Sequence, residues 1–137
     1  MIDFDVVIEK TNSIQNCLKR IQNTIKADVN RLEILDVQDI VVLNLQRAIQ
    51  LVLHMASYIV SVERLGTPKA PQDLFQILEQ NQWIQHDLSN KMQKMVGFRN
   101  IAVHDYQAID PSILKSILSL HLKDLEEFYE AIIKKAR

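Results

Sequence analysis

The chain has 137 residues, with 16 Lys and Arg, 17 Asp and Glu and a formal net charge of -1. We therefore expect one domain, residues 1–137, without an overall electrostatic attraction to nucleic acid. The only glycines, Gly66 and Gly97, exclude a Walker loop and a dinucleotide-binding fingerprint, and the single cysteine, Cys17, excludes internal disulfides and cysteine-based zinc clusters.

The N-terminal residues carry acids where a signal peptide needs positive charge followed by an apolar block. The longest uninterrupted apolar runs hold only a few residues, so we expect no segment that spans a membrane. We expect an intracellular, cytoplasmic protein, because a reducing environment suits one unpaired cysteine.

In the first half of the chain, apolar residues recur at three- and four-residue steps from residue 3 to about 26, which predicts a helix. Residues 31–37 form an uncertain joint. The strongest helix follows, with a broad apolar stripe through Val41, Val42, Leu45, Ile49, Val52, Leu53, Ala56 and Ile59. This apolar surface is wider than the single face that a bundle buries, so we infer that part of it serves self-association.

In the second half, residues 66–71 (GTPKAP) interrupt the helical pattern, since two prolines and a glycine cannot continue a helix. Helices are predicted from Asp73 to Gln80 and from about Asp87 to Ala102. Asp110 and Pro111 predict the start of the last helix, as N-cap and first helical residue. Strand signals are weak, so the expected fold class is all-α, a single-domain antiparallel bundle of four to five helices.

Three histidines outside the main motif are interpreted as structural. His121 and His54 lie among apolar residues of two predicted helices, and we expect both to be core imidazoles rather than ligands. His86 precedes Asp87 at a predicted helix start, which indicates a capping or surface position. No pair of histidines lies four residues apart beside an acid, so we expect no metal site.

The most unusual segment is residues 95–110 (MVGFRNIAVHDYQAID), where Arg99, Asn100, His104 and Tyr106 lie close together between apolar residues. A permanently charged guanidinium suits a phosphate, and an imidazole exchanges a proton near neutral pH. These groups suffice in principle to cleave an RNA phosphodiester without a metal. The same composition also suits a polar helix terminus that is followed by an Asp-Pro turn.

The spacing of Arg99 and His104 limits how they can act together. Five residues apart on a continuous helix, their side chains diverge by about 140°. Either the helix ends near Val103, or a cleft combines residues from two copies across a dimer axis. Lys91 and Lys94 lie upstream on the same predicted helix, as RNA-binding candidates or as ordinary solvated lysines.

The run from Arg99 to Tyr106, RNIAVHDY, resembles the signature of the HEPN superfamily. With Gly97 and Phe98 before it, the segment is similar to HepT-like toxins of HEPN/MNT toxin–antitoxin pairs. The resemblance covers essentially the whole chain and implies a HEPN-like helical domain. It also implies a homodimeric, metal-independent endoribonuclease that needs no cofactor and has motifs from both subunits in one cleft.

The resemblance also implies residue roles. Arg99 and His104 match the catalytic pair of the family, and Asn100 matches the polar residue that supports them. Tyr106 matches the tyrosine that an MNT-type nucleotidyltransferase antitoxin modifies with AMP, which silences the toxin. The sequence departs from the family near His54, where the second helix often carries an acid.

Two other functions are compatible with the chain. A HEPN-like domain can serve as a non-catalytic binding module for a nucleotidyltransferase, although a degenerate motif would be expected there. A purely structural helical dimer would leave the motif unexplained.

Overall fold

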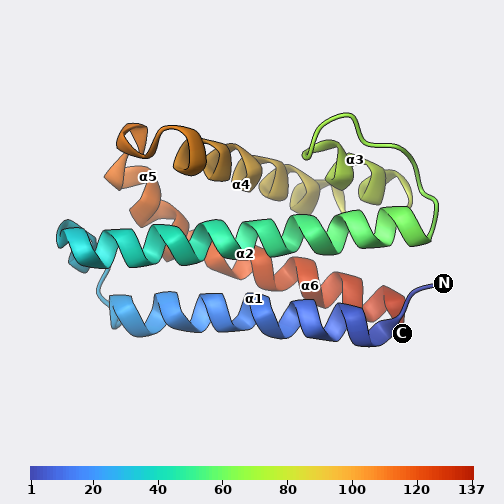
Figure 1. Ribbon diagram of the computed structural model, residues 1–137, viewed down its shortest axis with the longest axis horizontal. Helices are drawn as coiled ribbons and strands as arrows, with labels where there is room; N and C mark the ends of the chain where they lie inside the picture. The colour runs from blue at the N-terminus through green and yellow to red at the C-terminus, as the bar shows by residue number, and fades with distance from the viewer.

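The computed structural model describes residues 1–137 as a bundle of helices without strands (Figure 1). The chain continues helically from α5 through a π turn into α6, so the bundle has five helices and the predicted all-α fold is confirmed. Both chain ends lie at the same end of the bundle (Figure 1). The helices are α1 (Phe4–Ile25), α2 (Leu35–Val62), α3 (Asp73–Gln80), α4 (His86–His104), α5 (Pro111–Ser116) and α6 (Leu122–Ala136).

Local chemistry sets the helix boundaries close to where the sequence predicts them. The carboxylate of Asp3 accepts a hydrogen bond from the backbone N–H of Asp5 and caps α1. Asp110 caps α5 by accepting from the backbone N–H of Ser112 at 2.8 Å, with Pro111 as the first helical residue. Hydrogen bonds from the Ser112 side chain and backbone lower the pKa of the Asp110 carboxyl. The uncertain joint, expected at residues 31–37, lies a little earlier in the structure: a 3₁₀ turn spans Val29–Glu33 and α2 already begins at Leu35.

Helix α2 is the central helix of the bundle, because it contacts α1, α3, α4 and α6. The whole predicted apolar stripe of this helix is buried. Much of the wide apolar surface is therefore used inside one chain, since four neighbours cover α2 rather than one. Exposed apolar side chains remain in its first half, at Leu35, Ile40 and Leu43.

The apolar character of α2 also bears on the expectation that no segment could span a membrane. By length and composition alone α2 could cross one, with a mean hydropathy of 1.3 over an 18-residue window. Polar residues interrupt its apolar runs, which is why counting uninterrupted runs missed this property. In the bundle, 56% of that window is buried, as in the core helix of a folded domain.

A π turn, Ile117–His121, interrupts the last helix and was not predicted. It turns the His121 side chain partly toward solvent, with 42% of its surface exposed, so the expected core imidazole is not observed. His121 Nδ1 instead lies 2.8 Å from Oδ2 of Asp124, whose side chain is 1% exposed. Such π turns occur often at functional sites.

Truncation of the central helix should test how strongly the bundle depends on it. We expect Leu45→Ala to lower the free energy of unfolding by about 2–5 kcal/mol, because Leu45 is fully buried and truncation leaves a cavity. Urea denaturation followed by circular dichroism measures the change. Leu120→Ala, the same substitution at a side chain that is 59% exposed, is the matched control. Equal losses in both variants would contradict the central position of α2.

Candidate active site at the end of α4

Arg99 is held by two neutral side chains. Its NH1 donates to Oε1 of Gln50 on α2 at 2.8 Å, and its NH2 donates to Oδ1 of Asn100 at 2.7 Å. Its buried Nε has no acceptor among the atoms of the chain. Because no carboxylate pairs with this guanidinium, its positive charge is not neutralised within the chain and remains available for an anion.

Through this hydrogen bond Asn100 orients Arg99. No hydrogen bond joins Asn100 to His104. His104 is the last residue of α4 and is exposed. The helix continues through this residue, so Arg99 and His104 keep the angular separation of about 140° that five helical steps give. A helix end before His104 does not bring the two side chains together.

Tyr106 follows α4 in a short 3₁₀ turn, Tyr106–Ala108, and reaches back to the start of α2. Its hydroxyl donates to Oδ1 of Asp39 at 2.5 Å. Partial burial, followed by the hydrogen bond to Asp39 and the negative charge of that carboxylate, raises the pKa of Tyr106 to about 12. Tyr106 is 38% exposed, so other molecules can reach its hydroxyl.

His54 is exposed, which corrects the expectation of a core imidazole. Its Nε2 lies 3.0 Å from Nε2 of Gln50. An amide nitrogen can only donate, so His54 Nε2 is the acceptor in this contact. The side chain of Gln50 also accepts a hydrogen bond from Arg99. His54 and Gln50 therefore form a series of hydrogen bonds that ends at Arg99 in the motif. His86, by contrast, is exposed as expected and lies 2.9 Å from Glu79.

Sequence reasoning missed Asp39 and Gln50 and interpreted His54 as a core imidazole, although these three residues of α2 contact the motif or support it. The spacing of these three residues along α2 could have indicated that they share one side of the helix. At 100° per residue, steps of eleven and four residues return to nearly the same side of a helix. A polar line on the one strongly apolar helix therefore marks the side that faces the motif.

The two lysines differ in their surroundings. Lys91 lies 3.7 Å from the buried carboxylate of Asp124, whereas Lys94 is exposed and unpaired. Both line a groove of about 560 Å³ between α4 and the π turn, together with Gly97, Ile101, His121 and other residues. His104 follows Gly97 by seven residues, two turns of helix, so the groove and His104 share one side of α4.

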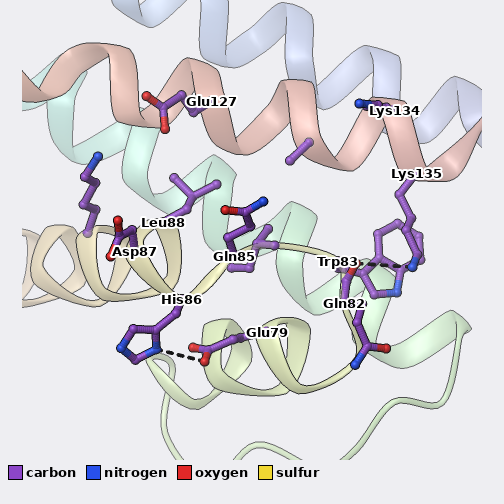
Figure 2. A pocket seen from close by; sticks show the side chains of 13 residues that line it. Glu79, Gln82, Trp83, Gln85, His86, Asp87, Leu88, Glu127, Lys134 and Lys135 are labelled. Atoms are coloured by element: carbon purple, nitrogen blue, oxygen red, sulfur yellow. Dashed lines mark hydrogen bonds and ion pairs between the residues drawn. The ribbon is translucent and has the colours of Figure 1, made fainter.

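A larger hollow of about 1050 Å³ lies elsewhere, between α6 and the connection from α3 to α4 (Figure 2). Its most evident contacts are the His86–Glu79 pair and Lys135 placed over the ring of Trp83, 5.6 Å from the centroid (Figure 2). No residue of the motif lines it. Size alone would therefore select a part of the molecule away from the motif.

Several known proteins are similar to this chain. A family model described as ribonuclease HepT-like matches residues 14–132. The mRNA nuclease HepT of Shewanella oneidensis is 39% identical over 128 residues, which is 93% of this chain and 96% of the relative.

Several solved structures are also similar to this chain. A tri-AMPylated Shewanella oneidensis HEPN toxin in complex with MNT antitoxin has a TM-score of 0.89 at 38% identity, with 100% of both chains covered. A toxin–antitoxin structure with AMP-PNP has a TM-score of 0.89 at 38% identity, with 97% of this chain and 99% of that chain covered. A cytosolic protein of unknown function from Bacillus subtilis shares the fold alone, with a TM-score of 0.85 at 14% identity over 98% of this chain and 90% of that one.

The contact with Asp39 should raise the pH at which Tyr106 ionises. With a pKa of about 12, we expect only about a tenth of Tyr106 to be ionised at pH 11. Asp39→Asn removes the charge that disfavours tyrosinate, so the midpoint should fall toward the ordinary value. NMR of ring-¹³C-labelled tyrosine, assigned with Tyr106→Phe, measures both midpoints. An unchanged midpoint in Asp39→Asn would contradict the contact.

Proposed function

This chain belongs to the HepT-like ribonuclease family, and we propose that Arg99, Asn100 and His104 carry an endoribonuclease activity that needs no metal or other cofactor. The observation that carries the proposal is that Arg99 is anchored by neutral side chains and His104 is exposed, both at the same end of α4. A preorganised guanidinium stabilises the charge that gathers on the phosphoryl oxygens of RNA, an effect often worth ~10²–10³ in rate.

His104 supplies the proton transfers in this proposal. As a base it accepts the proton of a ribose 2′-hydroxyl, whose oxygen attacks the adjacent phosphorus. As an acid it gives a proton to the leaving 5′-oxygen. The products then carry a 2′,3′-cyclic phosphate, or a 3′-phosphate after its hydrolysis, and a 5′-hydroxyl. Asn100 supports the reaction by holding Arg99 in place.

We further propose that the active form is a homodimer with one cleft across its axis. Within one continuous α4 the side chains of Arg99 and His104 diverge, so residues from two copies are needed to surround one phosphate. The exposed apolar residues Ile40 and Leu43 on α2, with Ile101 and Val103 on α4, support a contact surface beside the motif. One histidine from each copy can then divide the acid and base tasks.

RNA is the proposed substrate, and Lys94 and Lys91 are its proposed contacts along the groove that leads to His104. Lys94 is the stronger candidate of the two, because the ammonium group of Lys91 already lies near the carboxylate of Asp124.

We propose that residues 1–137 act as one HEPN-like domain in the cytoplasm. The unpaired Cys17 supports that location, because a reducing compartment keeps a thiol free.

Silencing by an MNT-type nucleotidyltransferase antitoxin completes the proposal. One solved relative is a tri-AMPylated toxin in complex with such an antitoxin. In this chain the acceptor is Tyr106, which lies two residues beyond His104 and is partly exposed. AMP on this hydroxyl adds a negative phosphate and a bulky nucleoside beside the cleft, so it repels and blocks an RNA backbone.

Cleavage of RNA in EDTA tests the catalytic residues. We expect His104→Ala to lower the rate about 10²–10⁴-fold, because it removes the proton-transfer group, and Arg99→Ala to lower it about 10²–10³-fold. End-group analysis should find cyclic phosphate with the wild type, after intact mass has shown that Tyr106 is unmodified.

His86→Ala is the matched control, since it removes an exposed histidine at the opposite end of α4. It should cleave like the wild type. Full activity in His104→Ala would place the chemistry elsewhere. No cleavage by unmodified wild type on several RNAs would favour a binding module instead.

The dimer is tested by its mass and its activity together. Sedimentation equilibrium should give about twice the 15.9 kDa of one chain. Leu43→Glu should produce monomers and abolish most cleavage, because it buries a charge in the proposed contact. Leu120→Glu, at an exposed leucine on the π turn, should leave the dimer intact. A wild-type monomer that cleaves RNA would refute a shared cleft.

A further inference from the structure

Asp39 is the one side chain of α2 that touches the hydroxyl of Tyr106. It lies in the exposed second turn of α2, whereas Tyr106 follows the end of α4, 67 residues later. The contact joins the two helix ends at the place where the motif stops. A surface tyrosine needs no such partner for stability, because water satisfies an exposed hydroxyl.

We infer that Asp39 is the base that accepts the proton of Tyr106 when AMP is transferred to it, so that the toxin supplies part of the catalytic machinery for its own modification. This inference rests on the proposed silencing of Tyr106 and names a residue for its mechanism. The Tyr106 hydroxyl already donates its hydrogen bond to Oδ1 of Asp39. Proton transfer therefore needs no rearrangement within the chain.

The reaction balances with a nucleoside triphosphate as the co-reactant. Oη of Tyr106 attacks the α-phosphorus, and an Oη–P bond forms. The bond from the α-phosphorus to the bridging oxygen breaks, and pyrophosphate leaves with the electron pair. The proton of Oη passes to Oδ1 of Asp39 as the ester forms, and Asp39 later releases it to water. A kinase aspartate accepts the proton of a substrate hydroxyl in the same way.

The need for a base follows from the state of Tyr106. Its raised pKa leaves almost no tyrosinate near neutral pH, so a ready-made nucleophile is absent. The attacking oxygen must lose its proton during the transfer. Asp39 both disfavours early ionisation and offers the acceptor at the moment when the oxygen becomes an ester.

Other charged groups near Tyr106 are less suited. Asp105 is adjacent in sequence, but its carboxylate makes no hydrogen bond with the hydroxyl. Asp36 lies one turn before Asp39 on α2 and is exposed without a side-chain partner. Asp36 is therefore a matched control for the loss of a negative charge at this end of α2.

The test measures transfer of AMP from α-labelled ATP to the full chain by its own MNT-type antitoxin. We expect Asp39→Asn to slow single-turnover transfer about 10²-fold or more, because the base is lost and the shape is kept. Asp39→Glu should restore part of the rate and Asp36→Asn should match the wild type. Tyr106→Phe should take no label.

The pH profile separates a base from a residue that only positions Tyr106. Without Asp39, transfer needs tyrosinate, whose fraction rises about tenfold per pH unit below its pKa. The ratio of wild-type to Asp39→Asn rates should therefore fall about tenfold per unit from pH 7 to 9. A constant ratio would overturn the base role, as would equal rates at pH 7.

The outcomes also separate this inference from the proposed silencing. Labelling of wild type and Asp39→Asn at equal rates refutes the role of Asp39 and leaves the silencing of Tyr106 intact. A wild type that takes no AMP refutes the silencing, and the role of Asp39 fails with it. Circular dichroism of Asp39→Asn confirms that any loss is not a loss of fold.

Discussion

The burial of α2 is the constraint on which the rest of the structure depends. A helix of 28 residues with this apolar content must be covered on most sides, and α1, α3, α4 and α6 all contact it. Most of its polar side chains then lie on the part that stays uncovered, together with the exposed Leu35, Ile40 and Leu43. Asp39, Gln50 and His54 lie on that part and face the end of α4. The packing of the core and the contacts of the motif therefore have the same cause.

The amide side chains that hold Arg99 determine how much of its charge is left to bind an anion. A carboxylate in the position of Gln50 would hold the guanidinium more tightly but would compensate its charge. An amide fixes the direction of the NH1 group and leaves the charge for a ligand. His54 supports Gln50 in turn, because its Nε2 accepts from the amide nitrogen of Gln50.

Much of the fold could be predicted from the sequence because its signals are local. Helical periodicity, residues 66–71 and the Asp110-Pro111 start act within a few residues, and each lies where it was expected. Only part of the candidate site could be predicted from such local signals. Arg99 and Tyr106 were identified from their motif, but their partners Gln50 and Asp39 lie 49 and 67 residues away and depend on tertiary packing. The π turn was missed because the sequence keeps three- and four-residue apolar steps through it, whereas its wider turn leaves Leu118 and His121 only partly buried.

The uncompensated charge of Arg99 has a consequence for how such a protein can be kept dormant. A guanidinium stays ionised at every physiological pH, so no change of acidity switches this group off. Only a competing anion can occupy it, and free anions in the cell are mobile and exchangeable. The proposed phosphate on Tyr106 is different, because a covalent attachment keeps it at the helix end that also holds Arg99, as a tethered counter-ion with a local concentration in the millimolar range or above. Dormancy in this proposal is an intramolecular inhibition, which RNA overcomes only at concentrations comparable with that local value.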